Sequence, residues 1–456
     1  MMAASPFLEQ VNLKETTKME LAALVALTLL LGALILLVAV AVRKQNVETD
    51  EPEQKAESVA QENHKPLTTK KPKPDKQRTR KDKAQHSFSH PLVASTLKSH
   101  SGNVTSIDFS SNGKYLASCA DDRTVRIWSV KDFMDREHKC LRANVDLDTA
   151  TLVSFSPDSR AFITWLSNAD TIRIFKMIKK EDGTFTFKAA PEDFPQKHKA
   201  SILNIGIAET GKFIMSASSD TSIHIWDLKG EILASISTNQ INNSYAAISP
   251  CGRFVASCGF TPGVKVWEVC FGKSGEFREV TRAFDLKGHS AGVHCFAFNN
   301  DSTRMVSVSR DGTWKLWNTD VEYKKQQDPY LLRTVSYGSS EGSLAALSPD
   351  GRVVAISSGC DVTMFDAGSG QREEELRGVH SGGITGLRFD INGRFLVCSG
   401  DKAIRVFHNA PGYRAAIKDM QEMLRKAQNE AMKQRLQQQI KDAQSALDTV
   451  LATPTD

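Results

Sequence analysis

The stretch Ser218–Gly230 reads SSDTSIHIWDLKG and places an alternating segment, SIHIW, between a polar turn and a Trp-Asp pair. Side chains that alternate in this way are typical of a half-buried β-strand. The same pattern, an alternating strand closed by an aromatic residue, occurs seven times along the chain. The closing residues are Trp128, Phe175, Trp226, Trp267, Trp317, Phe365 and Phe407.

The spacing of these aromatic residues indicates a repeat architecture. Successive ones lie 41 to 51 residues apart. A period of about 40–45 residues with four strands is that of a β-propeller blade, and insertions in outer loops lengthen it. Blades bury their faces only against each other, and we expect seven to close a ring. We also expect the strand LVASTL (Leu92–Leu97) to pair with the last strand of the seventh unit, which ends at Phe407. The sequence therefore predicts an all-β, seven-bladed propeller over residues 92–409.

Three units share a His, a Ser, an Asp and a Trp, with the Asp 22 and the Trp 28 residues after the His. The sets are His100, Ser118, Asp122 and Trp128; His198, Ser216, Asp220 and Trp226; and His289, Ser307, Asp311 and Trp317. Ser, His and Asp can form a hydrolytic triad. Three copies at one spacing, without a GxSxG elbow, instead indicate internal bracing. We therefore predict a non-catalytic protein without a cofactor or a metal site.

The sets and the period resemble those of the WD40 repeat family, in which such residues form a hydrogen-bonded tetrad. The resemblance covers residues 92–409 and implies a platform for protein partners. The seventh unit keeps His380 and Asp401, but we align Val397 with the Ser and Phe407 with the Trp. The second, fourth and sixth units lack the set.

Partner contacts are expected beside the tetrad Asp, where side chains should project from the blades. The four candidate positions are Asp121, Ser219, Arg310 and Gly400. Some WD40 proteins are substrate receptors of ubiquitin ligases and carry a WDxR ending. This chain has one literal Trp-Asp, Trp226-Asp227, with Lys229 where the Arg would stand, which weakens that alternative but leaves it open.

A 20-residue tail (1–20) precedes Leu21–Val42, which is 22 residues without a charge or a proline. As a helix it would span ~33 Å, enough to cross a bilayer. We predict a transmembrane anchor, with a cleaved signal peptide as the alternative. Arg43 and Lys44 follow the span directly and favour a cytosolic propeller. The eight cysteines, which form no CxxC pair, agree with a reducing compartment.

Residues 43–91 have the composition of a disordered linker. Within it, Lys65–Lys83 holds nine basic residues and two acidic ones. This segment is a solvated spacer or contacts anionic lipid or RNA by charge neutralisation. The residues that would make these contacts are Lys70, Lys71, Lys73, Lys76, Arg78, Arg80, Lys81 and Lys83.

The arrangement of one N-terminal span ahead of a propeller closely resembles a membrane-anchored member of the WD40 family. That resemblance implies an adaptor of the endoplasmic reticulum, with a stress kinase among its partners and a role in translation control. RNA or ribosome binding through the basic linker is the alternative function.

After the propeller the hydrophobic period changes from two to about 3.5 residues. Apolar residues recur at spacings of 3 and 4 from Ile417 to Ala431, and a step of five leads to Leu436. The pattern predicts one amphipathic helix over residues 412–451. Its apolar stripe packs on the propeller or pairs with a coiled-coil partner.

Overall fold

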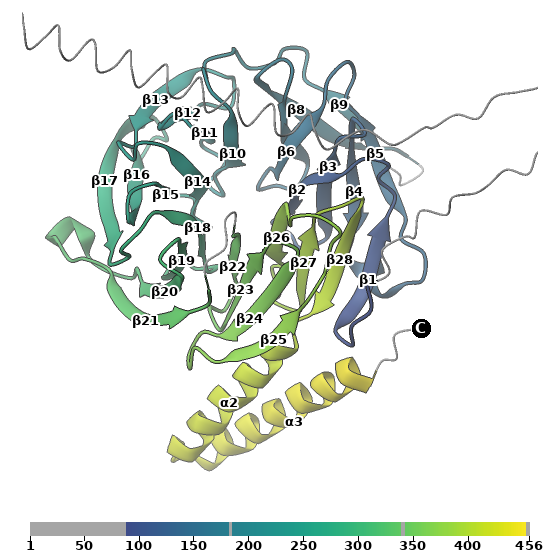
Figure 1. Cartoon of the computed structure of the whole chain (residues 1–456), viewed down its shortest axis with the longest axis vertical. Coiled ribbons are helices and arrows are strands. Elements are labelled where there is room, and N and C mark those ends of the chain that lie inside the picture. The colour runs from purple at the N-terminus through teal and green to yellow at the C-terminus, as the bar shows by residue number, and fades with distance from the viewer. Residues whose placement is uncertain (1–87, 182–184, 339–342, 453–456) are drawn as a thin grey trace, which may run out of the picture. The chain divides into compact units, whose positions relative to one another are not determined.

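The computed structural model describes residues 88–181, 185–338 and 343–452. Within them the chain forms seven antiparallel sheets of four strands, arranged as blades around an axis (Figure 1). In each blade the first strand along the repeat is innermost and the last is outermost, except that β1 supplies the outer strand of blade 7. The predicted seven-bladed propeller is confirmed.

Blades 1 to 4 follow in chain order. Blade 1 holds β2 (Val104–Phe109), β3 (Tyr115–Ala120), β4 (Thr124–Ser129) and β5 (Cys140–Asn144), with the short 3-10 helix η1 (Val130–Met134) before β5. Blade 2 holds β6 (Ala150–Phe155), β7 (Ala161–Leu166), β8 (Thr171–Lys179) and β9 (Phe185–Ala189). Blade 3 holds β10 (Ile202–Ile207), β11 (Ile214–Ser218), β12 (Ser222–Trp226) and β13 (Ile232–Ser237). Blade 4 holds β14 (Asn243–Ile248), β15 (Phe254–Gly259), β16 (Gly263–Phe271) and β17 (Phe277–Lys287).

Blades 5 to 7 complete the ring. Blade 5 holds β18 (Val293–Phe298), β19 (Arg304–Ser309), β20 (Thr313–Asn318) and β21 (Tyr330–Ser336), with the 3-10 helix η2 (Tyr323–Lys325) before β21. Blade 6 holds β22 (Ala345–Leu347), β23 (Val353–Ser358), β24 (Asp361–Asp366) and β25 (Arg372–Leu376). Blade 7 holds β26 (Gly386–Phe389), β27 (Phe395–Ser399), β28 (Ala403–His408) and β1 (Val93–Lys98).

The ring closes where the two ends of the propeller sequence meet. Strand β1 pairs antiparallel with β28, with Val93 opposite Phe407 and Lys98 opposite Ala403. This is the closure that the sequence predicts. It covers the outer edge of β28, which removes a site for edge-to-edge aggregation.

The core lies between neighbouring blades. One apolar cluster joins Val125 of blade 1 to Val153 and Phe162 of blade 2. The second strand of each blade is covered on both faces, which explains its small side chains: in β3 (YLASCA) five of the six residues are buried. The ring is therefore held together by contacts between sheets as well as within them.

The last residues assigned to the linker belong to the propeller. The ring of Phe88 packs edge-on against Phe407 at 5.8 Å between centroids, and the Arg405 guanidinium lies over Phe88. Phe88 is apolar and would be costly to leave in water, so it docks on blade 7. The described part of the predicted linker, residues 88–91, is thus ordered.

The C-terminal segment is two helices, where the sequence predicted one. Helix α2 (Ala410–Lys426) and helix α3 (Glu430–Ala452) pack against each other beside blade 6 (Figure 1). The helix breaks at residues 427–429, and the Asn429 side chain accepts a hydrogen bond from the Ala431 N–H. An Asn is a favoured N-cap, so this residue starts a new helix within the stretch that the apolar pattern predicted as one helix.

The apolar stripe of the helices is used by the chain itself. Ile417, Leu447 and Val450 belong to the same buried cluster as Leu92 and Phe407. The shortest ion pairs between α2 and blade 6 join Arg352 to Asp419 at 2.6 Å and Arg414 to Glu374 at 2.7 Å. Packing on the propeller is therefore the observed arrangement.

The predicted anchor, Leu21–Val42, lies outside the described residues. Among the residues that are described, none of the helices combines the length and apolarity needed to cross a membrane.

Candidate protein-binding face

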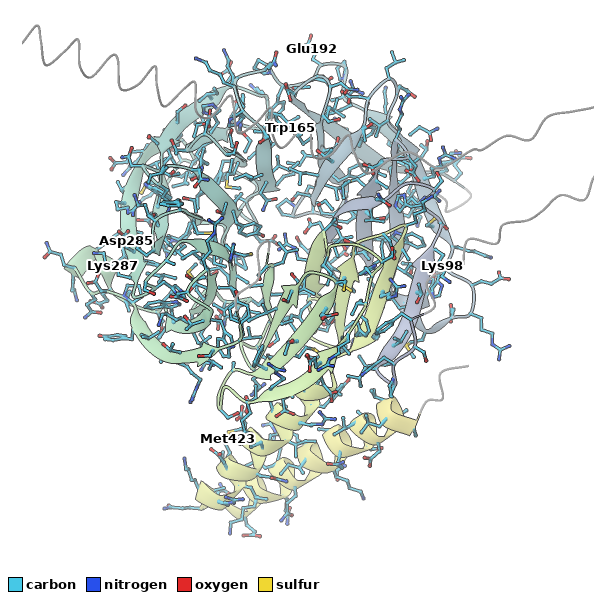
Figure 2. All side chains as sticks on the ribbon, in the orientation of Figure 1. Lys98, Trp165, Glu192, Asp285, Lys287 and Met423 are labelled. Carbon is cyan, nitrogen blue, oxygen red and sulfur yellow. The ribbon has the colours of Figure 1, made fainter. Side chains whose placement is uncertain are left out.

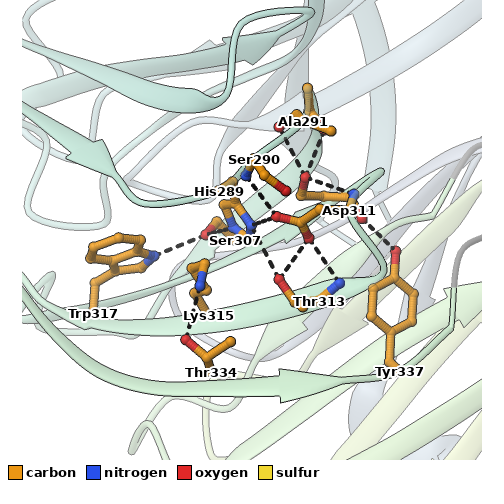
Figure 3. Close-up of polar contacts among 12 residues, drawn as sticks. His289, Ser290, Ala291, Ser307, Asp311, Thr313, Lys315, Trp317, Thr334 and Tyr337 are labelled. Carbon is orange, nitrogen blue, oxygen red and sulfur yellow. Dashed lines mark hydrogen bonds and ion pairs between the residues drawn. The ribbon is translucent and has the colours of Figure 1, made fainter.

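The tetrad of blade 5 is a continuous chain of hydrogen bonds (Figure 3). The Trp317 indole N–H donates to the Ser307 Oγ at 2.9 Å, and Ser307 Oγ lies 2.8 Å from His289 Nε2. His289 Nδ1 lies 2.9 Å from the Asp311 carboxylate. The indole can only donate, so the consistent assignment has Ser307 donating to Nε2 and Nδ1–H donating to Asp311. Every group then has a partner.

Within this hydrogen-bonded tetrad, only the Asp311 carboxylate at its outer end carries a charge. Burial lowers the pKa of His289, which favours the neutral ring despite Asp311 beside it. Burial alone would raise the pKa of Asp311, but hydrogen bonds from Thr313, the Ser290 N–H and His289 outweigh it and lower that pKa. The carboxylate therefore stays ionised and fixes both loops that contact it.

Blade 1 repeats this arrangement. Trp128 Nε1 lies 2.9 Å from Ser118 Oγ, which lies 2.8 Å from His100 Nε2. His100 Nδ1 lies 3.0 Å from Asp122. Burial opposes ionisation of Asp122, yet the hydrogen bonds from Thr124, Ser101 and His100 lower its pKa to about 2.

Blade 3 differs at the carboxylate. Trp226, Ser216 and His198 are linked as in the other blades, at 2.8 and 2.6 Å. His198 Nδ1, however, meets the Ser222 hydroxyl at 3.3 Å, and Ser222 donates to Asp220 at 2.6 Å. The Ser222 hydroxyl therefore bridges His198 and Asp220, which the sequence pattern predicted to bond to each other directly.

Blade 7 carries a fourth network that the sequence alignment placed one residue off. His380 Nε2 lies 3.3 Å from Cys398 Sγ and Nδ1 lies 3.1 Å from Asp401. Cys398 is 18 residues after its histidine, as Ser118 is in blade 1, so Cys398 and not Val397 takes the serine position. The turn that follows is one residue shorter here, which shifts Asp401. The spacing of 18 residues was the signal that could have found Cys398.

These geometries exclude the serines as nucleophiles. Ser118, Ser216 and Ser307 are fully buried, and each oxygen accepts an indole N–H. Within the described residues, no three His, Cys, Asp or Glu side chains are grouped as metal ligands would be.

The other three blades brace the same loops with different groups. In blade 2 the Asp148 carboxylate accepts from the Asn168 and Ala169 N–H groups at 2.9 and 3.0 Å. In blade 4 the buried Gln240 side chain exchanges two hydrogen bonds with Ser257. In blade 6 Asp361 accepts from the Gly378 N–H.

All these braces hold one side of the ring, which we call the tetrad face: the turns between the second and third strands and the loops that lead into the first strands. Three predicted contact positions lie on it with accessible side chains. Asp121 and Arg310 are exposed and Ser219 is half-buried. Gly400 is buried, and a Cβ there would lie 2.7 Å from His380 Cγ. It is a glycine because the histidine packs on it, so it is not a contact position.

Sequence reasoning missed three exposed apolar side chains on this face. Leu147, Ile241 and Phe260 are 93%, 75% and 55% exposed. The signal was a large apolar residue inside an otherwise polar loop, as in TNQINNS. The basic positions predicted to contact RNA or lipid, Lys70 to Lys83, lie outside the described residues.

Comparison with known proteins decides the family. The chain is 60% identical to transducin beta-like protein 2 of Mus musculus over 94% of its own length and 97% of that protein. It is 63% identical to transducin beta-like protein 2 of Homo sapiens over 82% of its own length and 85% of that protein. This chain belongs to the transducin beta-like protein 2 family. A periodic tryptophan protein 2 homolog of Dictyostelium discoideum is far more distant, at 23% identity over 49% of this chain and 22% of that protein.

The WD domain, G-beta repeat model matches residues 92–129, 193–227, 280–318 and 374–408 of this family member. These four segments contain the blades with a histidine network. The blades between them are braced by Asp148, Gln240 or Asp361, so they keep the fold without the motif. The propeller and the relationship to transducin beta-like protein 2 support a WD40 scaffold that binds proteins.

A cavity of about 470 Å³ opens on the opposite side of the ring. Its wall includes Tyr245, Phe296, Phe389 and the guanidinium of Arg388. Tyr245 and Asp108 raise the pKa of Arg388 against the opposing effect of burial. The cavity is the opening of the central channel on the side opposite the tetrad face, as expected for a propeller.

Proposed function

We propose that this protein is a membrane-anchored, non-catalytic scaffold that gathers protein partners on its propeller. The observation that carries the proposal is the use of the tetrad polar groups: the donors and acceptors of each tetrad bond to one another and fix the loops. Chemistry is thereby excluded from the tetrads, and the outward side chains of the fixed loops remain available for contact.

The apolar run Leu21–Val42 supports a membrane anchor, and the resemblance stated above favours the endoplasmic reticulum with the propeller in the cytosol. A stress kinase and the translation machinery are the partners that the resemblance implies. The scaffold would act by co-localisation, because the span holds the propeller and its partners at one membrane.

The three Asn-X-Ser/Thr sites of the propeller test the orientation. Asn103, Asn242 and Asn300 are all exposed, so the folded surface presents each of them. A cytosolic propeller carries no N-glycan, and the protein does not change mobility on treatment with a glycosidase. An inserted Asn-X-Thr site near residue 5 becomes glycosylated, which provides the control. A glycan on any of the three propeller sites would overturn the orientation.

Proximity labelling tests the scaffold itself. A biotin ligase fused to the full-length chain is compared with the same fusion lacking residues 21–42. We expect a shared set of proteins from the propeller and loss of the membrane neighbours in the deletion. Identical labelling by both fusions would contradict the role of the anchor.

RNA binding is the second candidate because nine basic residues lie within Lys65–Lys83. Ultraviolet crosslinking of RNA to the intact protein should fall when the eight candidate Lys and Arg residues are changed to Gln. If crosslinking is unchanged in this variant, Lys65–Lys83 is not the segment that contacts RNA.

A further inference from the structure

Two exposed apolar side chains occupy neighbouring loops of the tetrad face at blade 4. Ile241 lies in the loop before β14 and Phe260 in the turn after β15. The loops are joined by a hydrogen bond of 3.3 Å from the Phe260 N–H to the Asn242 carbonyl. We call Ile241 and Phe260 the apolar pair. Both are more than half exposed, so the isolated protein gains little from burying them.

The backbone of the loop adds a cost to this exposure. Ile241 has φ +67° and Asn239 has φ +50°. A left-handed conformation is common for Asn but unfavourable for a β-branched residue, whose Cβ crowds the backbone. The fold therefore holds an isoleucine in a strained conformation without burying it.

Surrounding groups fix the strained loop. The Lys265 ammonium donates to the carbonyls of Thr238 and Asn239 at 2.7 and 3.0 Å. Gln240 is buried on Ser257, and the Asn243 amide donates to the Ser218 carbonyl at 2.8 Å. Strain that is so over-determined is typical of binding and catalytic sites, where it pre-organises a side chain.

Glycines fix the turn that carries Phe260. A Cβ on Gly259 would overlap the Asn242 carbonyl. A Cβ on Gly292 would lie 2.8 Å from the Phe260 carbonyl oxygen. Both positions require glycine for the loops to approach this closely, so the apolar pair is held on a rigid base.

A basic residue, Arg310, lies beside the apolar pair. The Arg310 N–H donates to the Gly292 carbonyl, which places Arg310 next to the turn of Phe260. The guanidinium is exposed, forms no ion pair among the described residues, and its neighbour Asp311 is held by His289. In blade 3, Lys197 and Lys199 are exposed in the loop before β10, and Asp220 is exposed in the turn after β11. Lys287 is the last residue of β17 and lies at the rim (Figure 2).

We propose that the apolar pair and Arg310 form a docking site for a linear polypeptide segment with two apolar side chains beside acidic residues. The apolar side chains would pack on Ile241 and Phe260, and the carboxylates would pair with Arg310. This deepens the proposed scaffold function and rests on it. A rigid, strained pair selects one peptide shape, whereas a fluid anionic membrane would gain nothing from the strain.

A displayed library of random dodecapeptides, selected on the purified full-length chain, tests the site. Peptides that pair two apolar with two or more acidic residues should be enriched. Affinity for a selected peptide should fall at least ~10-fold in Ile241→Asn and in Phe260→Ser. Asn tolerates φ +67°, so Ile241→Asn should melt no lower than the native chain, and its loss of affinity cannot be due to unfolding.

Charge reversal and a matched control complete the design. Arg310→Glu should shift the selected peptides from acidic to basic. Leu228→Ser removes a side chain of similar exposure from the opposite side of blade 3 and should not change the affinity.

Three outcomes would overturn the site: no enriched peptide, enrichment indifferent to Ile241 and Phe260, or binding of phosphatidylserine vesicles that the same variants abolish. In each case the partners found by proximity labelling remain, so failure of this site is separable from failure of the scaffold function.

Discussion

At the scale of single residues, the serine is the central member of each tetrad, because its hydroxyl is hydrogen-bonded to both the indole N–H and the histidine ring. Removing it leaves both groups buried and unpaired, and the cost of an unsatisfied buried donor exceeds the value of the bond itself. Blade 7 shows that sulfur occupies the same position beside His380.

Ser307→Ala should lower the free energy of unfolding by about 1–3 kcal/mol. Ser307→Cys should lower it less, because Cys398 occupies the same position in blade 7. Urea unfolding of the native chain and the two variants gives both differences. Equal losses for Ala and Cys would show that volume rather than the polar link matters.

Histidine burial predicts loss of stability in mild acid. Burial, and then the neighbouring His224, lower the pKa of His198 from 6.5 to about 4. The unfolded chain therefore binds a proton as pH falls through 6.5 while the folded chain does not, so stability is complete above pH 6.5 and declines toward pH 4. The full loss is about 3 kcal/mol from this group.

Urea unfolding at pH 7.5 and pH 5 measures the part of this loss that occurs above pH 5. Asp122, with a pKa of about 2, stays ionised across that window and does not contribute. His224→Gln should reduce the pH dependence, because it removes the second cause of the lowered pKa. An unchanged dependence in this variant would place the effect in other histidines.

The sequence predicted three tetrads because the His, Ser, Asp and Trp keep the same spacing in three of the blades. It misplaced Cys398 because the turn after Cys398 is one residue shorter than in blade 1, so that counting back from Asp401 leads to Val397. The sequence marks Ile241 only as an apolar residue in a polar loop, because its exposure follows from a loop conformation that Lys265 imposes from another strand.

At the scale of elements, the C-terminal helices are part of the propeller. The apolar stripe, with its one five-residue step, predicted one helix, because the spacing of apolar residues does not show where a helix is capped. Asn429 was the available signal: an Asn followed by Glu430 is a typical helix start.

Ile417→Ala should lower the free energy of unfolding by about 2–4 kcal/mol, since Ile417 is 8% exposed within the cluster of Leu92 and Phe407. Met423→Ala is the control on the same helix, where Met423 is 43% exposed (Figure 2). Thermal unfolding of both variants measures the difference. If the two were equivalent, α2 would not be packed on the propeller in solution.

At the scale of the whole molecule, closure of the ring depends on β1. Residues 82–456 form one compact unit, so a deletion of residues 1–81 should leave the melting temperature unchanged. A deletion of residues 1–98 removes β1 and exposes β28, and we expect aggregation and loss of cooperative unfolding. Size-exclusion chromatography and calorimetry distinguish the two deletions. Cooperative unfolding of the shorter chain would show that six complete blades suffice.

The pairing of β1 with β28 also sets a delay during synthesis. Val93 pairs with Phe407, 314 positions later, and Lys98 pairs with Ala403, 305 positions later. A ribosome that adds about 5–20 residues per second needs roughly 15–60 s to make that interval. During this time β1 has no strand to pair with, and the ring of blades is not closed. The newborn protein is therefore a substrate for chaperones until its final strand emerges.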